Sequence, residues 1–480
     1  MSGKVKGVRA THKEYDELSP VWERCSDAVD GQRAIHKART AYLAKLKDED
    51  EDGYCARLGR SDFFNATWRT ISGLVGMAFR KEPTAEVPTA IEPFLDDIDL
   101  AGTSLNAMAK DLVEDVLEYG RIGIMVDHPE RPANVTALSK SAAEQLGLRP
   151  TLQVYGAESI INWRYGRVNG STVLTMVVLK ECELIQVSEF EAKEEDRYRV
   201  LDLDETGVYR QRVFRIDDKG NDELVSEVFP MMNGKPMPFV PFYIIGANGI
   251  ATETDEPPLI DLVDANIAHY QLNSDYRHGL HFTGLPTPWV SGYAQDSTNP
   301  ASFYIGSKSA WVFPDPQAKV GFLEFSGQGL NALKEAIAAL EQRMAILGAR
   351  MIADETSQVE TLGATQIKRQ GENSVLSAIV IAVSAVIEKA LGVMSEWAGG
   401  SGPVVFKISR EFMPVPMTAQ DLTALVGAWQ NGALSEAELF DLFKRGDLID
   451  GGKALDEHQA EVEITAPAPV KPAMPGSMAA

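Results

Sequence analysis

The chain has 480 residues and a formal net charge of −23, with 44% hydrophobic and 24% charged residues. This composition belongs to a folded globular protein with a large core and excludes a disordered scaffold. The excess of carboxylates argues against a protein that grips nucleic acid over a broad basic surface, because such binding depends on Lys and Arg displacing counterions.

The first 130 residues are predicted to be mainly helical. Apolar residues at helical spacing predict helices over 12–30, 33–47 and 65–80, with an acidic loop between the second and the third. Prolines after residue 80 end the third helix. Ser104 and Gly120 are suited to begin and end a fourth helix, and a short strand then runs up to Pro129.

Residues 151–229 are predicted to form antiparallel strands. Short runs rich in Val, Tyr and Phe alternate there with turn residues such as Asp217 to Gly220. Helices followed by such a meander predict an α+β fold class.

Two long helices are predicted on either side of a segment rich in Gly, Pro, Ser and aromatic residues. The first begins near Pro257 and Pro258, and the second covers 330–352. The second helix carries a heptad seam, and a stripe of small residues lies off that seam, so we expect it to contact two neighbours. The seam consists of Leu330, Leu333, Ile337, Leu340, Met344, Leu347 and Met351, and the stripe consists of Ala338, Ala339, Ala345, Gly348 and Ala349.

A third long helix is predicted over 367–398, followed by a strand at 403–412. Short amphipathic helices with starts at Thr418 and Ser435 come next. The tail, 466–480, is rich in Pro and Ala, and we expect it to be disordered.

No pattern in the sequence predicts catalysis or a bound cofactor. Cys25, Cys55 and Cys182 lie far apart, which predicts neither a zinc site nor a disulfide framework and favours a reducing compartment. His278 and His281 have an i, i+3 spacing that could hold a metal, but no HExxH motif accompanies them. A nucleophile elbow, a P-loop and a dinucleotide-binding motif are also missing from the sequence. The longest apolar run, 375–391, is interrupted by charges, so we expect no membrane span.

Five stretches of the sequence resemble the portal proteins of tailed bacteriophages, and more closely a branch of portal-like proteins long described as having unknown function. They are NATWRTISGLVGMAFRKEP near residue 70, EYGRIGIMVDHP near 120, YGAESIINWR near 160, NIAHYQLNSDYRHGLHFTGLPTP near 280 and FLEFSGQGLNALKEAIAALEQRMAILGARM near 340. Together they span roughly residues 60 to 410. The order of long helix, small β unit and long helix is the feature that resembles portals in general.

The resemblance implies a ring, typically of twelve copies, at one capsid vertex of the virion, assembled in the host cytoplasm. Double-stranded DNA would pass through such a ring without sequence specificity. The implied protein partners are terminase, the major capsid or scaffolding protein, and an adaptor or tail protein. The resemblance implies no enzymatic step, no cofactor and no metal. An acidic chain suits a conduit, since DNA that must slide should not be held by many ion pairs.

The resemblance also divides the chain into parts. It implies a wing over 1–245, a linker and first stem helix over 246–282, a clip over 283–329, a second stem helix over 330–352, a tunnel loop over 353–366, a long helix and return strand over 367–410, a helical crown over 411–465 and a tail over 466–480.

Three groups of residues follow from this division as expectations. DNA would pass Lys334, Arg343, Arg350, Glu355, Gln358, Glu360, Lys368 and Arg369. Subunits would pack through the heptad seam from Leu330 to Met351. The clip would contact partners through Trp289, Tyr293, Phe303, Tyr304 and Trp311.

Two alternatives remain open. Another head-tail structural protein, such as an adaptor or a minor capsid component, would also be acidic and oligomeric, although adaptors are usually far shorter. A head-maturation hydrolase or nuclease would need a reactive constellation, for which His278 and His281 are the residues to test.

Overall fold

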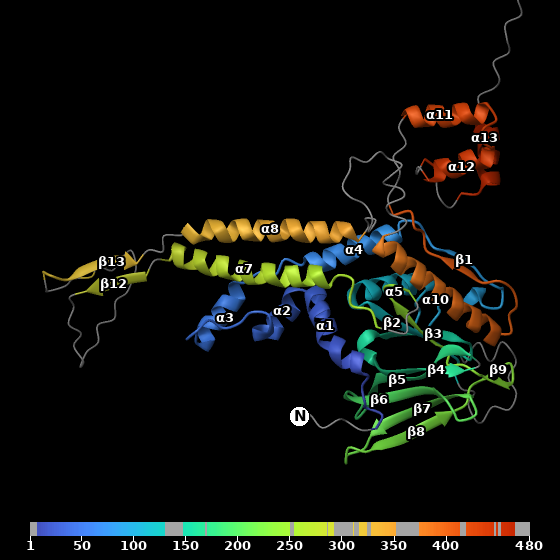
Figure 1. The fold of residues 1–480 in the computed structure, drawn as a ribbon, viewed down its shortest axis with the longest axis horizontal. Coiled ribbons are helices and arrows are strands. Elements are labelled where there is room, and N and C mark those ends of the chain that lie inside the picture. The colour runs from blue at the N-terminus through green and yellow to red at the C-terminus, as the bar shows by residue number, and fades with distance from the viewer. Residues whose placement is uncertain are drawn as a thin grey trace, which may run out of the picture.

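The structure is a computed structural model and has a mixed α+β fold, as predicted (Figure 1). It describes residues 7–129, 147–168, 170–249, 254–285, 287–291, 311, 316–323, 328–351, 374–412, 419–445, 448–449 and 453–465. The predicted tunnel loop, the start of the third long helix and the C-terminal tail lie outside these ranges.

The N-terminal part is helical, but two of its predicted boundaries were wrong. The second predicted helix ends at Ala38 instead of continuing to residue 47. The predicted acidic loop contains a helix that begins after Asp50, whose carboxylate accepts a hydrogen bond from the N–H of Gly53 at 2.7 Å. The helices are α1 (Lys13–Asp30), α2 (Gln32–Ala38), α3 (Glu51–Arg60), α4 (Ala66–Ala78) and α5 (Leu105–Tyr119).

The caps predicted for α5 are confirmed. The Ser104 hydroxyl accepts a hydrogen bond from the N–H of Ala107, and Gly120 adopts the left-handed conformation with a φ of 72°. The chain then enters β2 (Arg121–Asp127), the middle strand of a three-stranded antiparallel sheet. Its neighbours are β3 (Thr151–Gly156) and β11 (Phe242–Gly246).

The predicted meander is a five-stranded antiparallel sheet in sequence order, seen below the helices in Figure 1. The hairpin of β5 and β6 is longer than β4, so its distal part has only its own two strands. The strands are β4 (Ile160–Val168), β5 (Ser171–Gln186), β6 (Ala192–Leu203), β7 (Tyr209–Ile216) and β8 (Asp222–Val228). Short strand pairs are made by β9 (Met231–Met232) with β10 (Lys235–Pro236), and by β1 (Thr84–Glu86) with β14 (Val405–Lys407).

Two long helices extend from this body side by side, with a two-stranded hairpin at their far end (Figure 1). They are α7 (Ile260–Gly284) and α8 (Gln328–Arg350), close to the predicted ranges. The hairpin pairs β12 (Thr287–Ser291) with β13 (Lys319–Leu323) in antiparallel register. The C-terminal helices are α11 (Ala419–Gln430), α12 (Glu436–Arg445) and α13 (Leu455–Thr465).

The main core surrounds α10 (Val375–Trp397), which packs against α4, α5 and the sheet that contains β2. Leu262 of α7, Met344 of α8 and Met351 just after α8 also belong to this core, so both long helices pack into it at the same end. Of the helices in the described ranges, α10 alone is long and apolar enough to cross a bilayer. Its sequence is explained without a membrane, because residues such as Ile379, Val383 and Leu391 are fully buried in the protein.

Candidate functional site: the long helix pair

The pair of α7 and α8 is antiparallel and is closely packed along its length. At the far end, Leu330 of α8 lies over Gly279 of α7, where a Cβ on residue 279 would come within 2.7 Å of the leucine. At the near end, Asp261 of α7 and Arg350 of α8 line the same groove. A larger residue at position 279 would push the two helices apart, since interiors have little free volume.

The heptad seam of α8 faces the inside of the chain. Ile337, Met344 and Met351 are buried, with exposed fractions of 9%, 3% and 5%, and Leu347 packs on the main core. Leu330, Leu333 and Leu340 are half-buried. The heptad spacing therefore identified the side of α8 that packs within a single chain. That the same residues also pack between subunits stays a prediction.

A histidine that was not among the predicted site residues links the two helices. His269 is 2% exposed, and its Nε2 lies 3.4 Å from Oε1 of Glu341 on α8. The ring of Phe64, which precedes α4, lies 5.9 Å from the histidine ring. His269 follows the helical apolar spacing of α7, so its sequence context gave no signal that it would contact a carboxylate 72 positions later.

Polar side chains buried on α7 fasten it to the body. Asn266 is fully buried and accepts hydrogen bonds from the backbone N–H groups of Ala66 and Thr67 at the start of α4. Further along, Ser61 after α3 and Ser274 of α7 are in contact through their hydroxyl oxygens at 2.7 Å. Small hydroxyl residues let α3 and α7 approach closely, and both contacts fix the direction in which the pair leaves the body.

The predicted DNA-contacting residues that the structure describes are on α8 and exposed. Lys334, Arg343 and Arg350 have exposed side chains, and within the described ranges no carboxylate forms an ion pair with any of them. Arg343 and Arg350 line a groove of about 400 Å³ together with Ile346. Glu355, Gln358, Glu360, Lys368 and Arg369 lie outside the described residues.

The hairpin at the end of the pair exposes apolar side chains. Trp289 stands directly across from Gly321, and its indole lies over the glycine, 3.0 Å from where a Cβ would be. Trp289 is 42% exposed, and Phe322 and Leu323 are 56% and 69% exposed. Tyr293, Phe303 and Tyr304 lie outside the described residues, whereas Trp311 is described and half-buried.

The histidines near the end of α7 do not form a metal site with other described residues. In the described ranges, no group of three or more His, Cys, Asp or Glu side chains could hold a metal ion. Burial, together with Arg60 and Arg57, lowers the pKa of His278 and favours its neutral form. The rings of both His278 and His281 pack edge-on against Phe282.

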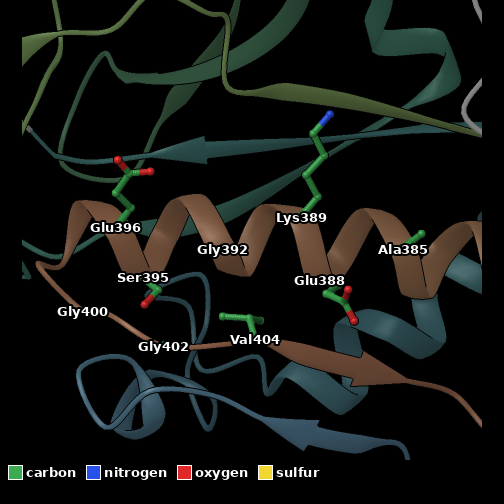
Figure 2. Close-up of a pocket in the computed structure, with 9 residues that line it drawn as sticks. All are labelled: Ala385, Glu388, Lys389, Gly392, Ser395, Glu396, Gly400, Gly402 and Val404. Atoms are coloured by element: carbon green, nitrogen blue, oxygen red, sulfur yellow. The ribbon is translucent and has the colours of Figure 1, made fainter.

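A second hollow runs along α10 beside the strand β14, with a volume of about 450 Å³. Figure 2 shows Glu388 and Ser395 on the side of α10 nearest Val404, and Lys389 and Glu396 on the other side. The Glu388 carboxylate accepts a hydrogen bond from the N–H of Phe406 at 3.2 Å. Glu388 thus anchors the strand that returns after α10, and the hollow presents no nucleophile with an adjacent base.

Carboxylates gather where α1 meets α5. Burial, reinforced by Asp111 and Glu114, raises the pKa of Asp115 to about 7. Burial also raises the pKa of Glu118 to about 7, with further contributions from Asp115 and Asp30. Mutual repulsion and loss of water both disfavour the charged forms, so these two groups titrate close to neutral pH.

The part of the chain that contains the helix pair matches a family model. Residues 258–398, from just before α7 to the end of α10, match the model described as Domain of unknown function (DUF4055). The match covers less than half of the chain, and the description of the family gives no activity. No curated protein matches the chain.

Several solved structures are similar to the chain at low identity. One, titled "Neck of empty GTA particle computed with C6 symmetry", is 12% identical, with a TM-score of 0.39 and coverage of 84% of this chain and 96% of that one. A second, titled "Virion of native gene transfer agent (GTA) particle", is 11% identical, with a TM-score of 0.38 and coverage of 84% and 94%. A third, titled "Neck of native GTA particle computed with C12 symmetry", is 12% identical, with a TM-score of 0.39 and coverage of 78% and 89%. Similarity at this level carries no argument about function.

Proposed function

We propose that this chain is a phage portal protein, a ring-forming component of the capsid vertex through which DNA enters and leaves. One observation carries the proposal: α7, the hairpin β12–β13 and α8 project from an α+β body, and the long helix α10 follows them in the sequence. This is the order of parts that the resemblance implies for stem, clip, stem and long helix. In this assignment the body is the wing, and α11, α12 and α13 form the crown.

The negative net charge of the chain is consistent with a channel that binds DNA only weakly. A copy carries a net charge of −23, so a ring of such copies repels the phosphate backbone over most of its surface. Lys334, Arg343 and Arg350 provide isolated positive charges on the exposed surface of α8, with Lys334 and Arg343 on opposite sides of the helix. The assigned mechanism is structural and electrostatic, and no covalent step is assigned to this chain.

The exposed apolar side chains of the hairpin suit a docking surface for successive partners. Trp289, Phe322 and Leu323 stand at the far end of the helix pair, away from the main core. Aromatic side chains concentrated on a small projecting element are typical of binding hot spots. The partners assigned to this end are terminase during packaging and an adaptor or tail protein afterwards.

Electron microscopy of the purified full-length chain tests the assignment. We expect rings with a central opening and about twelve copies, the number that the resemblance implies. A chain that stays monomeric at all concentrations, also together with its capsid and scaffolding proteins, would refute the portal assignment.

Deletion of residues 355–362 tests the predicted tunnel loop. We expect the variant to form rings as the parent does, because the deleted residues lie outside the helix pair, and to reduce the amount of DNA packaged per particle. Normal DNA filling with the variant would show that this segment does not contact the DNA.

A further inference from the structure

The three C-terminal helices, which lie together in Figure 1, enclose a groove with a volume of about 410 Å³. Residues from all three helices line it, so the packing of the helices sets its form. We call it the crown groove and define it by Trp429 of α11, Glu436, Phe440 and Phe443 of α12, and His458 and Val462 of α13.

The floor of the crown groove is covered, whereas part of its rim is apolar and open to solvent. Phe440 is 6% exposed, because the His458 ring lies 5.1 Å from its ring and the Lys444 Nζ lies 4.9 Å from it. Trp429 and Val462 are 40% and 47% exposed. Grooves lined by aromatic side chains are the surfaces on which proline-rich segments dock. Trp429 and Val462 therefore provide the surface that remains for a ligand.

The crown groove also carries a negative charge that has no cation beside it. Among the described residues, no ion pair is formed by Glu436, the first residue of α12, whereas Glu461 is paired with Lys453. Lys444 lies eight positions after Glu436, which is about 12 Å along the helix. Residues 419–465 contain ten acidic residues and three basic ones. A ligand with an apolar side and one positive charge would match this surface.

The sequence that follows α13 has this chemistry. Residues 466–480 lie outside the described residues and begin where α13 ends. Pro469, Pro472 and Pro475 are spaced by three, and Lys471 is the only charged residue from 466 to 480. A polyproline II helix has three residues per turn, so in that conformation the three prolines share one side and the lysine projects from another.

We propose that residues 469–475 bind in the crown groove of their own chain as a polyproline II helix. The prolines pack on Trp429 and Val462, and the Lys471 ammonium lies at the Glu436 carboxylate. Seven residues in this conformation extend about 22 Å, which is longer than the ten-residue helix α12 at about 15 Å.

The short connection favours the tail of the same chain over that of another copy. Residues 466–468 are the only link between α13 and the docked segment, and they supply the turn that brings the chain back along the helices. A flexible linker this short gives an effective concentration in the millimolar range, so a contact too weak to join two separate chains is still occupied within one chain.

Disulfide trapping tests the contact directly. The background carries Cys55→Ser and Cys182→Ser, because both thiols are exposed, and keeps the buried Cys25. Glu436→Cys together with Lys471→Cys is expected to give a disulfide within one chain after mild oxidation of the full-length protein. Mass spectrometry of the monomer band from a non-reducing gel identifies the linked peptides.

Asp441→Cys together with Lys471→Cys is the matched control for this trapping. Asp441 is an exposed acidic residue of the same helix and does not line the crown groove. We expect the disulfide at residue 436 to form at least tenfold faster than the one at residue 441. Equal rates in the two double variants would overturn the contact, and disulfides found only between chains would overturn its assignment to one chain.

Hydrogen exchange of the full-length chain provides a second measurement that keeps the charges of the groove intact. Docking of the tail stabilises α12 and α13 against local opening, because a ligand that binds only the closed form favours it. Pro472→Asp is expected to raise the exchange rate of amides in residues 436–444 and 455–462 at least threefold. Pro467→Asp adds the same charge outside the docked segment and is expected to leave these rates unchanged.

Equal exchange rates in Pro472→Asp and the parent, or equal increases in the two variants, would contradict the docked tail. Both experiments read out a contact within one chain and can be made on protein that is monomeric or in rings. Their failure would leave the portal assignment standing, and a failure of the chain to form rings would leave this contact standing.

Discussion

Asn266 of α7 holds the first turn of α4 through Thr67. The Oδ1 of Asn266 accepts hydrogen bonds from the backbone N–H and the hydroxyl of Thr67, each at 3.1 Å. Its Nδ2 donates to the carbonyl oxygen of Phe64 at 2.8 Å. One fully buried side chain thus satisfies backbone groups at a helix start that lies 199 positions earlier, and it sets the angle between the long helix pair and the body.

We expect Asn266→Ala to lower the free energy of unfolding by about 2–4 kcal/mol, because it leaves buried donors and an acceptor without partners. Urea denaturation of the monomer measures this effect. Asp275→Ala on the same helix is the control, because Asp275 is exposed, and its effect should stay within about 0.5 kcal/mol. Equal effects from the two substitutions would show that the bonds of Asn266 do not stabilise the fold.

We expect Gly123→Ala in β2 to destabilise the body by about 1–3 kcal/mol through overpacking. A Cβ on Gly123 would lie 2.3 Å from the ring of Phe242 on the neighbouring strand and 2.9 Å from Ile160. The control is Gly156→Ala in β3, where a Cβ meets no atom within 4 Å. Thermal unfolding should lower the Tm of the first variant only, and an unchanged Tm would show that Phe242 moves aside without cost.

The buried pair of Arg57 and Glu49 predicts a loss of stability in acid. Hydrogen bonding to Arg57 lowers the pKa of Glu49 to about 2, from an ordinary value of 4.5. Because the folded state binds this proton less readily than the unfolded state, the stabilisation is complete above about pH 4.5 and is lost as the pH falls toward 2.

Glu49→Gln should therefore have a smaller slope of unfolding free energy against pH than the parent between pH 4.5 and 2. The difference should be close to the slope that corresponds to the uptake of one proton on unfolding. Chemical denaturation at several pH values measures the slope. Glu51→Gln is the control, because the Glu51 side chain is 59% exposed, and it should keep most of the slope. Identical slopes for the parent and Glu49→Gln would contradict the assigned pairing.

Asp115 and Glu118 predict the opposite trend near neutral pH. Their pKa values are raised to about 7 in the folded chain, so the folded state keeps protons that the unfolded state has already released. Stability should therefore fall as the pH rises from about 4 to about 7, and the loss is complete above that.

We expect Asp115→Asn to be more stable than the parent at pH 8, by on the order of 1–2 kcal/mol, and to differ little from it at pH 4. Denaturation at the two pH values measures this difference. Asp111→Asn on the exposed side of α5 is a control that should change stability less. A variant that is less stable than the parent at pH 8 would show that the carboxylate has a cationic partner.

The parts of the fold that could be predicted from sequence are those controlled by local rules. Ser104 and Gly120 cap α5 as predicted, and the heptad seam marks the buried side of α8. The second predicted helix was too long because Arg39 adopts a positive φ of 52° and ends α2 early, although its neighbours favour a helix. Helix α3 was not predicted because a charged residue, Arg57, lies on its buried face and interrupts the apolar spacing. Arg57 can be buried there because it forms an ion pair with Glu49.

The candidate site depended more on contacts between distant segments. Spacing alone indicated that α8 has two neighbours, but it did not indicate that Thr70 of α4 occupies the position next to Gly348. Nothing in the sequence indicated the contacts of His269 and Asn266, because spacing does not specify the partner of a polar residue within an apolar stripe. Their partners lie 72 and 199 positions away.

The root of the helix pair has a consequence for how such proteins diversify. Leu262 near the start of α7 and Met351 just after α8 lie in the same core, so the chain departs from the body and comes back at adjoining points. The segment between them, which contains α7, the hairpin and α8, is therefore a single insertion into the body. An exchange of this segment at its two base points would replace the helix pair and its hairpin and leave the rest of the molecule unaltered.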